Sequence, residues 1–305
     1  MTVFDMRAIS GWLVVNRFLN TKKFTDITDL LTRAAEKHGV RLDVYTNDEL
    51  IPCMGGGQAA REFDILPAIK PDFVLFYDKD IRLAEQLEKR GLRLFNSARA
   101  IELCDDKSLM HVALDGLVPM PRTCCAPFTY ENIGYNNKRF VESMFDALGS
   151  PLVIKEVFGS FGQQVYLAQN PSEAAELLDR IGGKRVIFQE FISASAGRDL
   201  RLNVVGGRVI AAMERFNEHG DFRANISNGG SMRKHVPTAD EEELALKTAK
   251  LMGLDFCGVD LLMGENGPIL CEVNSNAHFR SIFECTGVNA ADEIMAHIVS
   301  VVKKV

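Results

Sequence analysis

The sequence predicts a mixed α/β protein with a small doubly wound first lobe followed by two α+β regions. Apolar strands alternate with amphipathic helices over residues 12–95, which is the pattern of β–α–β units around a parallel sheet. A proline-rich extended stretch at residues 118–127 connects into the second region. From residue 185 onward, strands come in hairpins. We therefore expect three lobes, with boundaries at 1–96, 97–184 and 185–305.

The first lobe is predicted to contain four strands and two helices. The strands are expected at residues 12–15, 42–45, 73–76 and 92–95, and the helices at 24–35 and 80–90. Apolar side chains recur at helical spacing from Phe24 to Ala35, and Gly39 ends that helix. The run 73–76 is apolar throughout, which is typical of a parallel strand covered on both faces.

The second and third regions carry capping and turn signals. Strands are expected at residues 151–155, 165–168, 185–191, 200–205, 208–215, 261–263 and 269–273, and helices from 171, from 238 to 252 and from 290 to 302. Asn170 followed by Pro171 is typical of a helix start, and a capping box opens the helix at Thr238. Gly206 and Gly207 predict a two-residue hairpin turn.

Composition excludes several classes of protein. The chain has 305 residues, of which 47% are apolar and 25% charged, so collagen, coiled coil and disorder do not describe it. A formal charge of -6 argues against nucleic-acid binding. No apolar run reaches the ~18–20 residues of a membrane span, and the first residues lack a signal-peptide pattern. Seven cysteines without a CxxC pair predict reduced thiols. We expect a cytoplasmic protein that binds neither nucleic acid nor membrane.

The sharpest chemical pattern lies on two neighbouring strands, which carry Asp260, Glu272 and Asn274. A three-residue loop at 265–267, with Gly267 left-handed, would place Asp260 opposite Glu272 and turn Asn274 to the same face. Three oxygen ligands suit Mg²⁺ or Mn²⁺. A two-residue loop would break the pairing by one position. The alternative is a polar sheet face with solvated carboxylates.

A second pattern is basic. Lys155 ends an apolar strand, and a Gly-Ser-Phe-Gly turn follows at residues 159–162. A strand lysine can reach phosphate oxygens, and a loop of small residues lets its N–H groups approach them. Taken alone, Lys155 and Lys107 would each be interpreted as an ordinary solvated lysine.

In chain order these segments resemble the ATP-grasp superfamily, and within it the RimK-like group of carboxylate–amine (glutamate) ligases. The resemblance covers roughly residues 96–305. It is carried by Asn96-Ser97, Asp106-Lys107, Val153-Ile154-Lys155, the 159–162 turn, Gln189-Glu190-Phe191-Ile192, Gly197 to Arg201, Arg215, Gly220 to Asn225, Asp260 and Glu272-Val273-Asn274.

The resemblance implies an ATP-grasp fold of three lobes with the nucleotide between the second and third. The implied ATP-binding residues are Lys107, Lys155, Gly159, Ser160, Gly162, Glu190, Phe191, Asp199, Arg223 and Asn225. Lys107 and Lys155 would contact the phosphates, and Asp199 the ribose. Asp260, Glu272 and Asn274 would hold two Mg²⁺ ions, or Mn²⁺. Arg215 would be catalytic, stabilising the transferred phosphoryl group or the tetrahedral intermediate.

The segment after Asn274 departs from the closest relatives, which continue with small residues and Pro-Gly. Here the chain reads Ser-Asn-Ala-His-Phe-Arg over residues 275–280, and we expect this segment to line the acceptor site. Arg280 is assigned to catalysis. The candidate substrate-binding residues are Arg17, Lys22, Arg201 and His278. The alternative is that these are ordinary loop residues.

The implied reaction is ATP-dependent amide or peptide bond formation through an acylphosphate, with ADP and phosphate released. The expected partners are a small-molecule carboxylate and an amine, such as an amino acid, or a peptide. Two alternatives stay open. One is a modifier of a ribosomal or ribosomally made peptide, and the other is a non-catalytic ATP-binding regulator. Association into a homo-oligomer also stays open.

Overall fold

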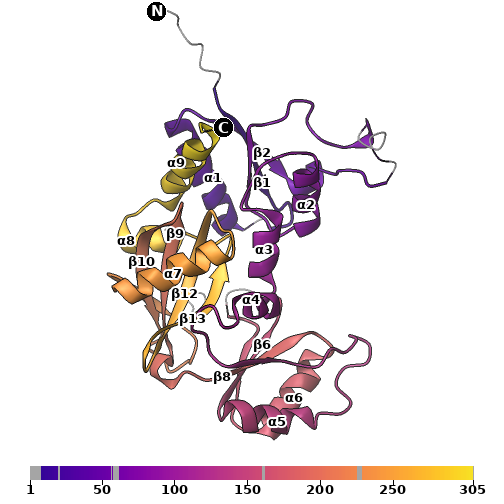
Figure 1. Cartoon of the computed structure of the whole chain (residues 1–305), viewed down its shortest axis with the longest axis vertical. Coiled ribbons are helices and arrows are strands. Elements are labelled where there is room, and N and C mark those ends of the chain that lie inside the picture. The colour runs from indigo at the N-terminus through magenta and orange to yellow at the C-terminus, as the bar shows by residue number, and fades with distance from the viewer. Residues whose placement is uncertain are drawn as a thin grey trace, which may run out of the picture.

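The computed structural model describes residues 8–19, 21–55, 57, 62–159, 162–224 and 229–304. Its strands form three sheets (Figure 1). The first lobe lies towards one end of the long axis and the middle sheet at the other, with the C-terminal sheet between them. Within the described ranges, none of the helices has the length and apolar composition that crossing a lipid bilayer requires.

The first lobe is a parallel sheet in the order β2-β1-β3-β4. Its strands are β1 (Ser10–Val15), β2 (Arg41–Thr46), β3 (Phe73–Phe76) and β4 (Leu94–Phe95), and its helices are α1 (Lys22–Lys37) and α2 (Ile81–Lys89). Every side chain of β3 is buried, because helices cover both faces of a parallel sheet. The predicted doubly wound lobe is confirmed.

The middle sheet is antiparallel, in the order β5-β8-β6-β7. Its strands are β5 (Thr123–Cys125), β6 (Leu152–Glu156), β7 (Val165–Ala168) and β8 (Val186–Glu190). Helices α5 (Phe140–Leu148) and α6 (Pro171–Ile181) cover one face, against which Ile154 and Phe188 pack. The next residues along each strand, Lys155 and Gln189, therefore turn to the opposite face.

The pairing of β8 differs from the expectation, which placed this strand in the segment 185–305. β8 pairs with β5 and β6, so the strand belongs to the middle sheet. Its apolar pattern identifies a strand without identifying the partners.

The C-terminal sheet has the order β11-β10-β9-β12-β13. Its strands are β9 (Arg198–Val205), β10 (Arg208–Phe216), β11 (Ser231–Lys234), β12 (Phe256–Gly264) and β13 (Gly267–Asn274). Helix α7 (Ala239–Leu251) covers one face, and α8 (Arg280–Thr286) and α9 (Ala290–Val302) lie on the other. Helix α1 joins the same core as α9, which fixes the first lobe against this sheet.

Two short helices, α3 (Ala98–Asp105) and α4 (Lys107–Leu114), connect the first lobe to the middle sheet. Neither was predicted, although each has a side-chain N-cap that marks it. The Ser97 side chain accepts from the Ala100 N–H, and that of Asp106 from the Leu109 N–H.

The hairpin of β12 and β13 has the predicted pairing of Asp260 with Glu272, but its loop length differs from the prediction. Gly264 pairs with Gly267, so the loop has two residues and the predicted three-residue loop is wrong. A β-bulge shifts the register, because Leu261 pairs with Leu270 whereas Asp260 pairs with Glu272. Cys271 is the extra residue. The bulge compensates for the shorter loop, and the predicted juxtaposition of Asp260 and Glu272 is confirmed.

Candidate functional site

A cleft lies between the middle and C-terminal sheets and encloses 840 Å³ of space, its open mouth included. Many of the predicted site residues line it. These are Lys107, Lys155, Gly159, Gly162, Glu190, Phe191, Asp199, Arg215, Arg223, Asp260 and Glu272. Residues separated by more than 160 positions in the chain therefore meet at one concave surface.

The wall formed by the middle sheet and α4 carries two buried lysines. The Lys107 Nζ donates to the Gly159 carbonyl oxygen at 3.0 Å, and the Lys155 Nζ lies 3.8 Å from the Cys271 Sγ. Neither ammonium has a carboxylate within 4 Å in the described ranges. Burial lowers the pKa of Lys107, and the charge of Glu272 opposes that effect. A buried cation without a counterion favours an anionic ligand.

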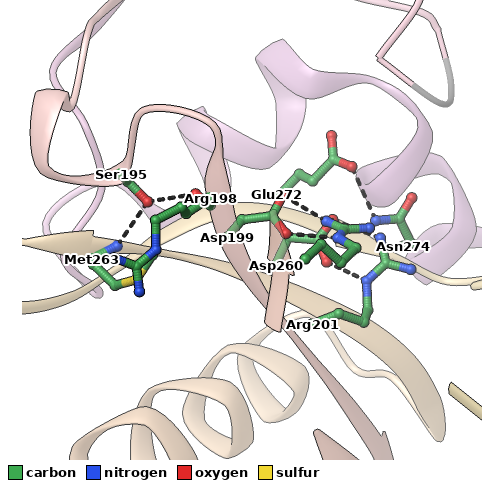
Figure 2. A network of polar contacts seen from close by, with 9 residues as sticks. Ser195, Arg198, Asp199, Arg201, Asp260, Met263, Glu272 and Asn274 are labelled. Atoms are coloured by element: carbon green, nitrogen blue, oxygen red, sulfur yellow. Dashed lines mark hydrogen bonds and ion pairs between the residues drawn. The ribbon is translucent and has the colours of Figure 1, made fainter. Parts of the chain in front are cut away.

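The opposite wall is a network of paired charges on neighbouring strands (Figure 2). Arg215 on β10 lies opposite Asp199 on β9 and donates to both of its oxygens, at 2.6 and 2.7 Å. Arg201 on β9 lies opposite Asp260 on β12 and is also bidentate, with 2.6 Å from Nη2 to Oδ2. Arg215 Nη2 lies 3.0 Å from Asp260 Oδ2 and joins the two pairs.

Protonation in this network follows from burial and proximity. Burial opposes ionisation of Asp260, but the Arg201 and Arg215 guanidiniums outweigh it and hold its pKa at about 2. Burial raises the pKa of Asp199, which Arg215 pulls back only in part. Both oxygens of Asp199 accept a hydrogen bond from Arg215 in this structure, and the ribose contact expected of Asp199 would use one of the remaining lone pairs of the same carboxylate.

Glu272 and Asn274 supply oxygen donors next to this network. The Asn274 Nδ2 donates to Glu272 Oε1 at 3.2 Å, and the Asn274 amide oxygen is left for another partner. No three Asp, Glu, His or Cys side chains in the described ranges converge as a metal site by themselves. Carboxylate and amide oxygens completed by phosphate and water are nevertheless typical of Mg²⁺. Glu272 and Asn274 fit a hard cation, whereas Asp260 would first have to exchange a guanidinium.

Three further ATP-binding candidates, Glu190, Arg223 and Gly162, form hydrogen bonds with neighbouring residues. Glu190 accepts from Arg122 Nε at 2.7 Å, so its side chain is committed at the rim of the cleft. Arg223 pairs with Asp221 and donates to the Gly162 carbonyl oxygen at 3.0 Å. Gly162 has a φ of 72°, which favours glycine there. Ser160 and Asn225 lie outside the described residues.

The predicted substrate residues Arg17, Lys22, Arg201 and His278 are not among the cleft-lining side chains. Arg17 and Lys22 are exposed. The ring of His278 packs edge-on against Phe24 at 4.7 Å. Burial, with Lys23 and Arg201 nearby, lowers the pKa of His278 to about 3.

Arg280 is not among the residues that line the cleft. It forms ion pairs with Asp26 on α1 and Glu284 on α8, and its side chain is 43% exposed. Its geometry argues against the catalytic role assigned from the sequence, because both partners hold the guanidinium at the surface.

Other residues of the cleft were missed. Among them are Val153, Gln164, Val165, Gln189, Ile192, Ser195, Arg198, Phe222, Leu262 and Cys271. The period-two alternation of a strand could have identified Val153, because it shares the face of Lys155. Cys271 could not have been identified this way, because the bulge changes which way its strand faces.

Comparison with known proteins identifies the family and the fold. The model of the RimK-like ATP-grasp domain matches residues 129–298. A Maridesulfovibrio salexigens protein named "Probable alpha-L-glutamate ligase" is 36% identical over 248 residues, which cover 79% of this chain and 78% of that protein.

Solved structures share the fold. The RimK domain ATP-grasp protein from Sphaerobacter thermophilus has a TM-score of 0.69 and 20% identity, covering 94% of this chain and 98% of the other. The ATP-grasp ligase PsnB, solved with a phosphomimetic variant of its minimal precursor, Mg and ADP, has a TM-score of 0.69 and 17% identity, covering 97% and 99%. The predicted ATP-grasp fold is confirmed. From its sequence match and its fold, the chain belongs to the RimK-like ATP-grasp family and is an ATP-dependent carboxylate–amine ligase.

Proposed function

We propose that the cleft binds ATP, with its phosphates on Lys107 and Lys155, and that the protein joins the amine of an amino acid to a small acid or peptide. The observation that carries this proposal is the pair of buried ammonium groups that have no carboxylate within 4 Å in the described ranges and that line one cleft with Glu272. A nucleotide's phosphates would supply anionic partners for these two lysines.

The chain's own residues would act mainly by positioning. A carboxylate oxygen of the acid attacks the γ-phosphorus, the bond to ADP breaks, and the two lysines hold the phosphate oxygens in place. The amine then attacks the acyl carbon, loses a proton to solvent and expels phosphate. Arg215 lies at the cleft and would stabilise the charge that develops on oxygen. The glycine-rich turn at residues 159–162, whose Gly162 carbonyl oxygen accepts a hydrogen bond from Arg223, would exclude water, which would otherwise hydrolyse the acylphosphate.

Glu272 and Asn274, joined by Asp260 after exchange of a guanidinium, would hold Mg²⁺ or Mn²⁺, and we propose two ions. Such ions neutralise charge on the phosphate oxygens. The guanidinium that Asp260 releases would be free to meet a substrate anion, which couples metal binding to substrate binding.

We further propose that the acid substrate lies towards Lys23, Arg201 and His278. Burial and the charge of Arg201 lower the pKa of Lys23, which supports a cluster of basic groups formed by Lys23, Arg201 and His278. A substrate carboxylate would relieve the repulsion. The name of the M. salexigens relative suggests glutamate as the added group, and PsnB was solved with a precursor, so a single amino acid and a peptide are both substrates to test.

The test is ADP release from the full chain with ATP, Mg²⁺ and panels of acids and amino acids, with products identified by mass spectrometry. We expect ADP release that requires both an acid and an amine. Glu272→Ala is expected to lower turnover by about 100-fold or more while ATP still binds weakly. Glu265→Ala, on the exposed turn of the same hairpin, is the matched control.

Full activity of Glu272→Ala would overturn the site assignment. ATP binding by the unaltered chain without substrate-dependent ADP release would instead favour a regulatory protein.

A further inference from the structure

The side-chain amide of Gln189 is held from behind the cleft by two elements. Its Nε2 donates to Thr123 Oγ1 on β5 at 2.9 Å and lies 3.2 Å from His111 Nε2 on α4. Gln189 is 2% exposed, yet it lines the cleft. Thr123 pairs directly with Gln189 across the two strands, so their side chains share a face.

These contacts use both hydrogens of the amide nitrogen. The Gln189 Oε1 forms no hydrogen bond within the described part of the chain and is the amide atom left for the cleft. An amide oxygen that faces the cleft can accept a hydrogen bond from an N–H group of a ligand.

The donor and acceptor roles follow from Thr123, whose hydroxyl donates to the Pro121 carbonyl oxygen at 2.8 Å and therefore accepts from Gln189 Nε2. The second hydrogen of that amide nitrogen then goes to His111 Nε2, which accepts it. Burial, helped by the charge of Lys155, lowers the pKa of His111 to about 4, so the imidazole is neutral at physiological pH. A neutral ring whose Nε2 accepts from Gln189 carries its proton on Nδ1. Helix α4 thereby supplies Lys107 and, one turn later on the same face, His111.

The surroundings of this carbonyl suit a flat heterocycle. Val153, Val165, Phe191 and Leu262 provide apolar lining of the same cleft. Phe191 follows Gln189 by two residues, and Val153 pairs with Gln189 on β6. The Gln189 carbonyl oxygen therefore belongs to a cleft that also presents apolar side chains, where one hydrogen bond can decide which base is accepted.

We propose that His111 and Thr123 are positioning residues that hold Gln189 with its carbonyl towards the cleft, so that the pocket selects a purine with a 6-amino group over one with a 6-oxo group. This inference rests on the proposed function, which puts the nucleotide in this cleft. A rotated amide would offer N–H to the cleft and favour the 6-oxo base instead.

The experiment measures the dissociation constants of MgATP and MgITP on the full chain by isothermal titration calorimetry, since these nucleotides differ at the purine 6-position. We expect the unaltered protein to bind ATP more tightly than ITP. His111→Leu and Thr123→Val each free the amide, and each is expected to reduce the ATP:ITP preference by about three- to tenfold. Thr123→Ser keeps the hydroxyl and should retain the preference. Val112→Ala, exposed on the same helix, is the control.

The proposal would be overturned if the unaltered protein bound ATP and ITP with equal affinity. It would also be overturned if the variants kept the ATP:ITP ratio of dissociation constants, whether their affinity for both nucleotides fell equally or did not change. Thr123→Val gives an independent reading if His111→Leu does not fold. Failure to bind either nucleotide would contradict the proposed function, whereas ATP binding with a variant-insensitive ratio would contradict only this inference.

Discussion

The two walls of the cleft handle charge in opposite ways. On the middle-sheet wall, Lys107 and Lys155 are buried beside carbonyl oxygens and a thiol, without a carboxylate within 4 Å in the described ranges. On the C-terminal wall, Asp260 and Asp199 are bound to Arg201 and Arg215, so each acid already has its guanidinium. The two lysines of the first wall therefore have no carboxylate partner in the described ranges, whereas the two aspartates of the second wall are neutralised by its two arginines.

This difference separates ligand binding from structural stability. Buried cations without partners weaken the empty protein and strengthen anion binding, whereas a closed ion-pair network loses stability when one member is removed. Changes on the two walls should therefore affect different measurements.

The largest effect is expected on the paired wall. Asp260→Asn leaves Arg201 and Arg215 without their shared carboxylate, and we expect the free energy of unfolding to fall by about 3–5 kcal/mol. Urea denaturation without metal or nucleotide measures this free energy. The control is Asp146→Asn, at an exposed position of α5. An unchanged midpoint would mean that the network does not hold these strands together.

A pH titration tests His111, which lies on α4 in the same wall of the cleft as Lys107 and Lys155. The pKa of His111 is about 4 when folded, against ~6.5 for a free histidine, so the unfolded chain binds more protons between these values. Above pH 6.5 the His111 imidazole is neutral in both states and should not affect the free energy of unfolding. As pH falls to 4, protonation of His111 in the unfolded chain should lower that free energy by up to about 3 kcal/mol. Unfolding measured from pH 4.5 to 8 should show a shallower decline in His111→Leu. Equal slopes for the two proteins would contradict this.

A smaller effect is expected from the lysine wall itself. Lys155→Met should weaken MgATP binding by about 10- to 100-fold, because a charge-assisted contact is lost. The free energy of unfolding should stay the same or rise, since a buried ammonium is removed. Titration calorimetry measures the affinity for MgATP, and urea denaturation measures the free energy of unfolding. The control is Lys247→Met, at an exposed position of α7. A loss of stability without a loss of affinity would reverse the contrast between the walls.

The smallest effect is expected outside both walls. Arg280→Ala removes exposed ion pairs to Asp26 and Glu284, so kcat should stay within about twofold of the unaltered enzyme. Steady-state ADP release measures it once a substrate pair is found. A large fall in kcat would support the catalytic role expected from the sequence. It would mean that the surface around Arg280, between α1 and α8, is part of the active site.

Local patterns predicted most of the elements. The hairpin turn at Gly206 and Gly207, the capping box at Thr238 and the apolar run of β3 each depend on neighbours in the chain, and each is observed. The caps Ser97 and Asp106 were equally local, and α3 and α4 could have been predicted from them.

The site was predicted less completely. The lysines of the cleft and the juxtaposition of Asp260 with Glu272 were anticipated, but the bulge at Cys271 was not. Arg280 was assigned a role that its ion pairs do not support.

The sequence by itself determined the strands, helices, caps and turns, because these depend on residues a few positions apart. Only the tertiary structure decided that β8 joins the middle sheet, that Arg201 and Arg215 neutralise Asp260, and that His111 stands behind Gln189. The physical reason is that strand partners, burial and protonation depend on groups far apart in the chain, which the folded core brings within a few ångströms of one another.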